Sequence, residues 1–256
     1  MVRVRVVRTE RTTDNFVTVT VGGAELAGFE FMGLDQCTRI FFPRPGQERL
    51  HLPHASADDG WVAEFRAMPE ERRPHVRNYT ARRFDAEALE MDIEFVAHGD
   101  EGPASAWALG ARPGDELGLL AEGVYHLPPE EADWHLLVGD ESAVPAILSI
   151  LEQSPPDLRG LAFLEVPSSA DVREVDAPAG VEVRWLARDG AHTVPGQLAL
   201  ETVSGAALPE GRPYCFVAGE NGLPTGLRRF LVKERGVAKE DIAFIGYWRA
   251  GTAAYA

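Results

Sequence analysis

The sequence predicts a chain in two parts, an antiparallel β-barrel followed by an α/β domain with a parallel sheet. Three observations predict it. Short segments that alternate apolar and polar residues fill about the first 124 residues, a Pro- and Glu-rich stretch follows, and strand-like and helix-like segments then take turns. Period-two alternation is typical of half-buried antiparallel strands, whereas strand–helix alternation predicts a parallel sheet covered by helices. We expect a barrel domain over 1–124, a linker over 125–132 and an α/β domain over 133–256.

The first domain should consist of short strands joined by turns. Besides the segment that begins at His75, antiparallel strands are expected at 2–8, 16–21, 29–31, 38–42 and 89–96. Pro43 stops the fourth of these, because proline cannot donate to a strand ladder. The following stretch, 44–60, is polar and punctuated by Pro and Gly, so it is expected to be a loop. Several short strands of this kind favour a small barrel.

The second domain should alternate its elements. Strands are expected at 134–139, 161–166, 181–186, 214–219 and 242–245, and helices at 142–153, 197–204 and 225–235. Gly236 is a typical helix end. In such a sheet, ligands collect at the carboxyl ends of the strands.

Composition excludes several classes of protein. The formal charge of -15 and a pI near 4.9 argue against nucleic acid as a partner. No apolar run approaches the roughly eighteen residues of a membrane span, and the first residues lack the apolar centre of a signal peptide, so we expect a cytoplasmic protein without membrane insertion. Cys37 and Cys215 lie far apart, which predicts neither a disulfide framework nor an iron–sulfur cluster or other resident metal.

The stretch His75 to Arg82 carries the most informative residues. Pro74 disfavours helix before it, so the stretch should be extended, and Arg77 and Tyr79 should then share one face. A guanidinium can pair with a phosphate, an aromatic ring can cover a heterocycle, and Thr80 adds a hydroxyl. This combination suits a flat heteroaromatic that bears a diphosphate. An ordinary edge strand with solvated arginines is the alternative.

The motif Arg-x-Tyr-Thr resembles the flavin-binding signature of ferredoxin-reductase-like flavoproteins. It belongs to an ordered series: Phe41-Phe42-Pro43, Arg77-Asn78-Tyr79-Thr80, His98-Gly99, Gly102 to Ala108, Gly139-Asp140-Glu141, Ala218-Gly219-Glu220 and Gly246-Tyr247-Trp248-Arg249. The series is similar to that of the siderophore-interacting protein family, which are FAD-dependent ferric-siderophore reductases. The resemblance implies an N-terminal flavin-binding barrel, a Rossmann-like NAD(P)-binding domain, and a flavin in the seam between them.

The segment Gly102 to Gly110 should be a helix that opens at a glycine and a proline. Free backbone N–H groups and the positive dipole end make such a start a seat for phosphate, and Ser105 can add its hydroxyl. The resemblance places this segment, with Gly102, Ala104 and Ser105, against the flavin diphosphate, and it adds His98 as a cofactor-binding residue. A plain helix start capped by Ser105 is the alternative, and Trp107 can equally belong to the core. One departure from relatives is Glu122, which stands where they usually show a Gly-Pro run; a carboxylate there is unfavourable beside a diphosphate unless it points outward.

The nicotinamide nucleotide should bind where strands of the second domain end. Asp140, Glu141 and Ser142 follow one strand and Glu220 ends another, but no G-x-G-x-x-G fingerprint is present, and Asp140 can instead cap a helix. The resemblance adds Trp248 near the flavin, with Tyr247 in the core; both can also be core ends of the last strand.

The choice between NADH and NADPH depends on three residues. Glu165 can accept hydrogen bonds from a ribose and favours NADH, whereas Arg184 or Arg188 can pair with a 2′-phosphate and favours NADPH. The resemblance inclines the choice towards NADPH.

A hydride carries two electrons and Fe(III) accepts one, so a carrier must divide the pair, and a flavin can do so. No side chain is then expected to be catalytic. For the anionic ferric siderophore, the basic residues Lys233 and Arg249 are the preferred contacts. A general flavin or quinone reductase, and a siderophore- or flavin-binding protein without turnover, are the alternatives. The oligomeric state is left open, with a monomer favoured.

Overall fold

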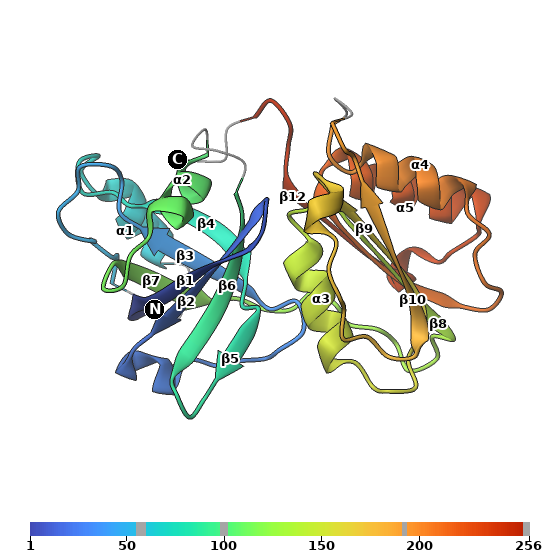
Figure 1. Cartoon of the computed structure of the whole chain (residues 1–256), viewed down its shortest axis with the longest axis horizontal. Coiled ribbons are helices and arrows are strands. Elements are labelled where there is room, and N and C mark those ends of the chain that lie inside the picture. Colours follow the sequence, from blue (N-terminus) through green and yellow to red (C-terminus); the bar gives the residue numbers. More distant parts are fainter. Residues whose placement is uncertain (55–59, 98–101, 191–193, 253–256) are drawn as a thin grey trace. The chain divides into compact units, whose positions relative to one another are not determined.

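The computed structural model describes residues 1–54, 60–97, 102–190 and 194–252 (Figure 1). The chain divides into two compact units. The first unit comprises Met1–Met32 and Gln36–Gly123, and the second comprises Gly33–Asp35 and the chain from Val124 onward. Within the described ranges, no helix combines the length and hydrophobicity needed to cross a membrane.

The first unit is built on a seven-stranded antiparallel sheet with the order β4-β3-β7-β1-β2-β6-β5. Its strands are β1 (Val2–Thr13), β2 (Phe16–Gly22), β3 (Cys37–Phe42), β4 (His75–Thr80), β5 (Arg83–Asp85), β6 (Glu90–Val96) and β7 (Glu116–Ala121). The alternating segments therefore form strands as predicted, apart from 29–31. That prediction is wrong: Phe29 and Phe31 lie in irregular chain and pack against Phe84, with ring centroids 6.0 and 5.3 Å apart. Their alternation reflects the packing of two rings on Phe84 without a strand partner.

The sheet curls around one apolar core. Val19, Ile40, Ile93 and Leu119 come from four different strands and are all fully buried in this core. Strand β4 packs beside β6 although the two are not hydrogen-bonded neighbours, and helix α2 (Pro103–Gly110) packs on β2, β4 and β6. The result is the rolled antiparallel sheet that the sequence predicts.

The predicted loop 44–60 ends in a helix that the sequence did not predict. The described part of the loop has no helix or strand, and α1 (Gly60–Ala67) begins at its last residue. The helix is held by Trp61, which is buried and meets Phe41 edge-on at 5.3 Å between ring centroids. A tertiary contact thus fixes α1, since an eight-residue helix has little stability of its own.

The second unit is a five-stranded parallel sheet with the order β10-β9-β8-β11-β12. Its strands are β8 (Trp134–Gly139), β9 (Arg159–Val166), β10 (Gly180–Ala187), β11 (Pro213–Glu220) and β12 (Ile242–Trp248), and its helices are α3 (Val144–Gln153), α4 (Gln197–Gly205) and α5 (Gly222–Glu234). The predicted elements are confirmed. Helix α5 begins three residues before the predicted 225, and β12 extends three beyond the predicted 245.

The chain reverses its direction across this sheet at β8. From β8 it proceeds to β9 and β10 on one side, and then to β11 and β12 on the other. The carboxyl ends of β8 and β11 therefore form a topological switch point, where open α/β sheets bind their ligands. Gly139 allows α3 to begin directly above this point, because a Cβ there would lie 2.6 Å from the Cβ of Ala143.

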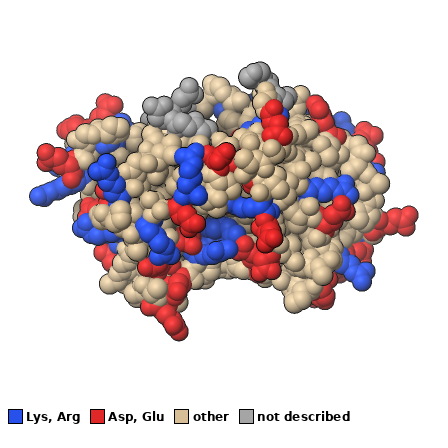
Figure 2. Space-filling view, viewed as in Figure 1, with Lys and Arg blue, Asp and Glu red and all other residues tan. Residues whose placement is uncertain are grey.

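Charges of both signs are interspersed on the face drawn in Figure 2. Some arginines of the first unit are paired: Arg5 lies 2.6 Å from Glu116, and Arg8 lies 2.5 Å from Glu90. Exposed pairs of this kind contribute little to stability. These pairs offset part of the positive charge that the arginines of β1 carry.

Candidate functional site

Strand β4 presents Arg77 and Tyr79 on one face, as the sequence predicts. Its register with β3 sets Arg77 opposite Ile40 and Tyr79 opposite Thr38. Directly opposed residues of antiparallel strands share a face, and both β3 partners are fully buried, so this face turns towards the core. Because β4 is the last strand of the sheet, its other edge has no hydrogen-bonded strand neighbour among the described residues.

Tyr79 is held by packing. Its ring lies on Phe95 of β6, with centroids 4.3 Å apart and planes at 40°. Burial raises the pKa of Tyr79 above its ordinary value, against the opposing effect of Arg77, so the phenol stays neutral and can donate a hydrogen bond. Thr80, the next residue, is buried at the end of the strand.

Arg77 supplies positive charge beside this ring. Its Nη1 donates to the carbonyl of Val76 at 2.7 Å. Burial lowers the pKa of Arg77, and nearby Arg44 acts in the same direction, but a guanidinium remains charged at any working pH. Burial, and then Arg44 and Arg77, also lower the pKa of His75. This end of β4 is therefore a region of positive potential that suits a phosphate group.

The start of α2 adds donors next to the same strands. Gly102 is extended at the N-cap, Pro103 opens the first turn, and no side chain caps the helix. First-turn N–H groups have no acceptor within their own helix. Ala104 and Ser105 are buried in this turn, whereas His98 lies outside the described residues. A cation, an aromatic ring and a helix start within one unit fit the diphosphate and ring system of a flavin dinucleotide.

Two further residues of the first unit have structural roles. Trp107 packs between Phe42 and Phe95 at 5.7 and 5.8 Å, so it belongs to the core. Glu122 forms an ion pair with Arg39 at 2.8 Å. This pairing offsets the charge of the carboxylate, so Glu122 is less unfavourable beside a diphosphate than an unpaired carboxylate.

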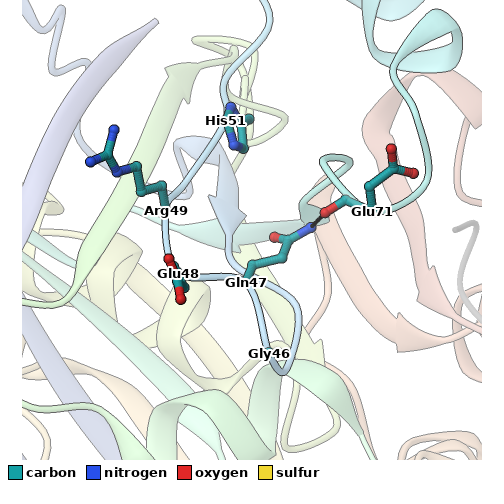
Figure 3. Close-up of a pocket in the computed structure, with 6 residues that line it drawn as sticks. All are labelled: Gly46, Gln47, Glu48, Arg49, His51 and Glu71. Atoms are coloured by element: carbon teal, nitrogen blue, oxygen red, sulfur yellow. Dashed lines mark hydrogen bonds between the residues drawn. The ribbon is translucent and has the colours of Figure 1, made fainter.

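The loop after β3 forms a polar cavity of about 270 Å³, lined by Gly46, Gln47, Glu48, Arg49, His51 and Glu71 (Figure 3). Gln47 accepts from the N–H of Arg44 and donates to the carbonyls of Glu71 and Arg73. These bonds tie the loop to the turn that precedes β4. The chain that leads into β4 is thereby anchored to this loop.

In the second unit, Asp140 organises the switch point. It accepts from the N–H and hydroxyl of Ser142 at 2.9 and 2.5 Å, from the N–H of Glu220 at 2.5 Å, and from the indole Nε1 of Trp248 at 3.3 Å. Burial and the neighbouring charge of Glu141 raise the pKa of Asp140, while the bonds from Ser142 and Glu220 lower it. Its side chain is fully buried. Asp140 therefore holds the ends of β8, β11 and β12 together, and its contact with a cofactor stays a prediction.

Glu220 closes the same edge. Its carboxylate accepts from Gly222 at 2.6 Å, at the start of α5, and from Ala250 at 3.1 Å. The expectation that Tyr247 is core is wrong: Tyr247 and Trp248 are 36% and 37% exposed, because they lie near the end of β12, an edge strand. Trp248, tied to Asp140, keeps an exposed face beside the switch point.

A buried ion-pair network, which the sequence did not predict, lies at the ends of β8, β9 and β10. Arg188 binds both Glu141 and Glu165. The expectation that Glu165 receives a ribose is wrong for this structure, since its carboxylate is fully buried and accepts from the N–H groups of Gly196 and Ala199. Arg184 is paired with Glu182 within β10 rather than at its carboxyl end. One signal in the sequence could have indicated this network: an acidic residue or an arginine stands at the end of each of these three strands, as Glu141, Glu165 and Arg188.

The predicted substrate contacts are solvent-exposed. Lys233 lies in the last turn of α5, and Arg249 follows β12. Among the described residues, neither side chain has an ion pair. Both contacts stay predictions, as does the flavin-filled seam.

Family models match almost the whole chain. One described as "Siderophore-interacting FAD-binding domain" matches residues 5–125, and one described as "Siderophore-interacting protein" matches residues 132–251. The ferric vibriobactin reductase ViuB of Vibrio cholerae is 36% identical over 96% of this chain and 88% of its own. The chain belongs to the siderophore-interacting protein family. Its recognition from the ordered motifs is confirmed.

Other relatives agree. The crystal structure of a siderophore utilization protein from T. fusca is 35% identical, covers 100% of this chain and 95% of its own, and superposes with a TM-score of 0.83. The NADPH-dependent ferric-chelate reductase of Escherichia coli is 29% identical over 96% of this chain and 91% of its own. The predicted fold class is confirmed, and FAD is the cofactor of this flavin-dependent oxidoreductase. Which residues contact FAD stays a prediction.

Proposed function

We propose that this protein uses NADPH or NADH to reduce the iron of ferric siderophores through bound FAD, which releases Fe(II) for iron acquisition. The observation that carries the proposal is the union of an FAD-binding unit with a parallel sheet that has a switch point, in a chain 36% identical to a ferric vibriobactin reductase. Two electrons enter as hydride and leave singly to iron. FAD, when bound, supplies that conversion.

In the first unit, the protein holds the cofactor. Arg77 would pair with the diphosphate, since charge-assisted bonds from a guanidinium are the strongest available to a phosphate. The first turn of α2, with Ala104 and Ser105, would donate N–H groups to the same anion. Tyr79 and Thr80 would border the ring system, with the Tyr79 ring fixed against Phe95.

In the second unit, the protein would hold the electron donor at the ends of β8 and β11. Ser142 is partly exposed at the entrance to α3, and Trp248 offers an exposed indole face. Asp140 keeps both at fixed positions through its hydrogen bonds. Its task is to position groups, and no described carboxylate needs to act as a base, because a hydride transfer leaves no proton on the protein.

The iron complex would be reduced intact. A tight ferric chelate leaves no coordination site for protein ligands, and within the described residues no group of three or more His, Cys, Asp or Glu side chains could hold a metal. Reduction weakens the hold of hard oxygen donors on the ion. The exposed Lys233 and Arg249 would attract an anionic chelate within an otherwise acidic protein.

The test is anaerobic spectroscopy of the purified holoprotein. We expect a flavin spectrum, bleaching by NADPH or NADH, and reoxidation by ferric vibriobactin with one Fe(II) captured per electron by a ferrous chelator. Rapid reoxidation by a quinone but not by the ferric complex would replace the proposal with a quinone reductase. A yellow protein that neither nucleotide bleaches would be a binding protein.

A further inference from the structure

Arg188 joins the carboxyl ends of three neighbouring strands through a buried network. Its Nη1 lies 2.7 Å from Glu141 and 2.7 Å from Glu165, and its Nη2 lies 2.8 Å from the other oxygen of Glu141. Glu141 follows β8, Glu165 lies near the end of β9, and Arg188 follows β10. This is the edge at which open α/β sheets bind nucleotides, and an arginine there can receive the 2′-phosphate of NADPH.

Glu165 is the fixed, inner member of the network. Its side chain is fully buried, and its two oxygens accept from Gly196 and Ala199, each at 2.8 Å, where α4 begins. The backbone of Arg188 is fixed as well, because its N–H donates to Val166 at 3.0 Å. Glu165 therefore offsets the charge of Arg188 whether or not a ligand is present.

Glu141 is the outer member. Its side chain is 9% exposed and that of Arg188 is 10% exposed, so a ligand would meet this pair first. Glu141 occupies both Nη atoms of the guanidinium, which is the two-point edge that a phosphate also uses. Two carboxylates face one guanidinium, so the network carries a net negative charge where a doubly charged phosphate would have to bind.

We infer that Glu141 sets the preference between NADPH and NADH by occupying the edge of Arg188 that would bind the 2′-phosphate. To bind Arg188, the 2′-phosphate of NADPH must replace Glu141 as the ion-pair partner, and it must approach a network with a net negative charge. NADH, with a 2′-hydroxyl, requires neither step. The inference rests on the proposed function, because it assumes that a nicotinamide nucleotide binds at the ends of these strands.

The test compares Glu141→Gln with Glu182→Gln in the holoprotein. Glu182 also forms a two-point pair, through Nε and Nη2 of Arg184 at 2.8 and 3.0 Å, but within strand β10. Calorimetry would measure the affinity for 2′,5′-ADP relative to 5′-AMP, and kinetics would measure kcat/KM for NADPH relative to NADH. We expect Glu141→Gln to raise both ratios about tenfold, as expected for loss of one competing ion pair. Glu182→Gln should change neither.

Two further variants define the role. Glu141→Asp, whose shorter side chain withdraws from the guanidinium, should raise the same ratios and serves if the Gln variant folds poorly. Adding Arg188→Lys to Glu141→Gln should abolish the gain, because lysine lacks the two-point edge. Unchanged ratios in both Glu141 variants would overturn the inference while leaving the proposed function intact. A wild-type protein that binds neither 2′,5′-ADP nor 5′-AMP, and whose flavin neither nucleotide bleaches, would overturn both.

Discussion

Asp140 at the end of β8 accepts a hydrogen bond of 2.5 Å from the backbone N–H of Glu220 at the end of β11. The two strands are neighbours in the sheet but 80 residues apart in the chain. The bond therefore closes the switch point, and the same carboxylate also fixes Ser142 and Trp248. Nucleotide binding should depend on this buried carboxylate, because it fixes the groups that surround the switch point.

We expect Asp140→Asn to raise the KM for the nicotinamide nucleotide about tenfold, with less change in kcat, and to leave the FAD content unchanged. The amide keeps one acceptor oxygen, but its NH2 group then faces either the N–H of Glu220 and the indole of Trp248, which share one oxygen, or the N–H of Ser142. Either arrangement costs about 1–3 kcal/mol. Steady-state kinetics and flavin absorbance would measure these effects.

Asp241→Asn is the matched control for Asp140. Asp241 is also buried and accepts two hydrogen bonds from Arg212, at 2.8 and 2.7 Å. It directly precedes β12, so it lies at the amino end of that strand and not at the carboxyl ends that form the switch point. It should lower the melting temperature without changing KM. If both variants shift KM alike, Asp140 stabilises the fold and does not position the nucleotide.

Gly219 tests the same contact from the other strand. Its φ of 139° is unfavourable for other residues, and a Cβ there would lie 2.6 Å from the Cγ of Asp140. We expect Gly219→Ala to displace Asp140 and to raise the KM as Asp140→Asn does, with the double variant no worse than either single one. Gly205→Ala, with open space around the new methyl group, should leave KM unchanged. Additive effects in the double variant would contradict the shared contact.

In the first unit, Arg77→Ala should weaken FAD binding about tenfold to a hundredfold, because a charge-assisted bond to phosphate contributes about 1.5–3 kcal/mol. Arg77→Lys should retain part of the affinity. Fluorescence titration of the apoprotein with FAD would measure both. Arg72→Ala, which removes an exposed arginine five residues earlier, is the control. Unchanged affinity in Arg77→Ala would place the diphosphate elsewhere.

Much of the fold could be predicted from periodicity, because burial of one sheet face imposes alternation on the first half of β1 and the first half of β6. The errors have physical causes. Phe29 and Phe31 are alternate residues packed on Phe84 without strand pairing, and α1 is fixed by the contact of Trp61 with Phe41. Both contacts join residues that are far apart in the chain, so the local sequence pattern could not reveal them.

The site could be located but not fully resolved from the sequence. Residue types at strand ends indicated the switch point, yet they could not show which carboxylates turn inward. Asp140 and Glu165 are both fully buried and satisfied by N–H groups from distant segments. A carboxylate at a strand end can thus bind a ligand, or it can accept hydrogen bonds from the backbone segments that surround the ligand. Only the three-dimensional structure distinguishes these two roles.

The last prediction concerns a buried histidine in the second unit. The His126 ring is 4% exposed and packs against His135, Tyr214 and Phe216, with centroids 5.5, 5.2 and 5.9 Å away. Among the described residues, neither ring nitrogen has a hydrogen-bond partner. Burial, and then the charge of His135, lower the pKa of His126 to about 3. Asp35, which accepts from the N–H of His126 at 3.0 Å, is the nearby carboxylate.

Because the folded pKa of His126 lies below the unfolded value of about 6.5, the unfolded chain binds the proton first as the pH falls. The contribution to stability is complete above pH 6.5 and is lost towards pH 3, by about 3 kcal/mol between pH 7 and 4. Asp35 acts in the opposite direction, since burial raises its pKa.

The measurement is the free energy of unfolding by urea at each pH, for wild type and for His126→Phe, which keeps Asp35. The variant should lose about 3 kcal/mol less on acidification. His54→Gln, which removes a surface ion pair with Glu64 at a side chain 96% exposed, should differ far less from wild type. Parallel curves for wild type and His126→Phe would mean that His126 takes up its proton without opening the fold.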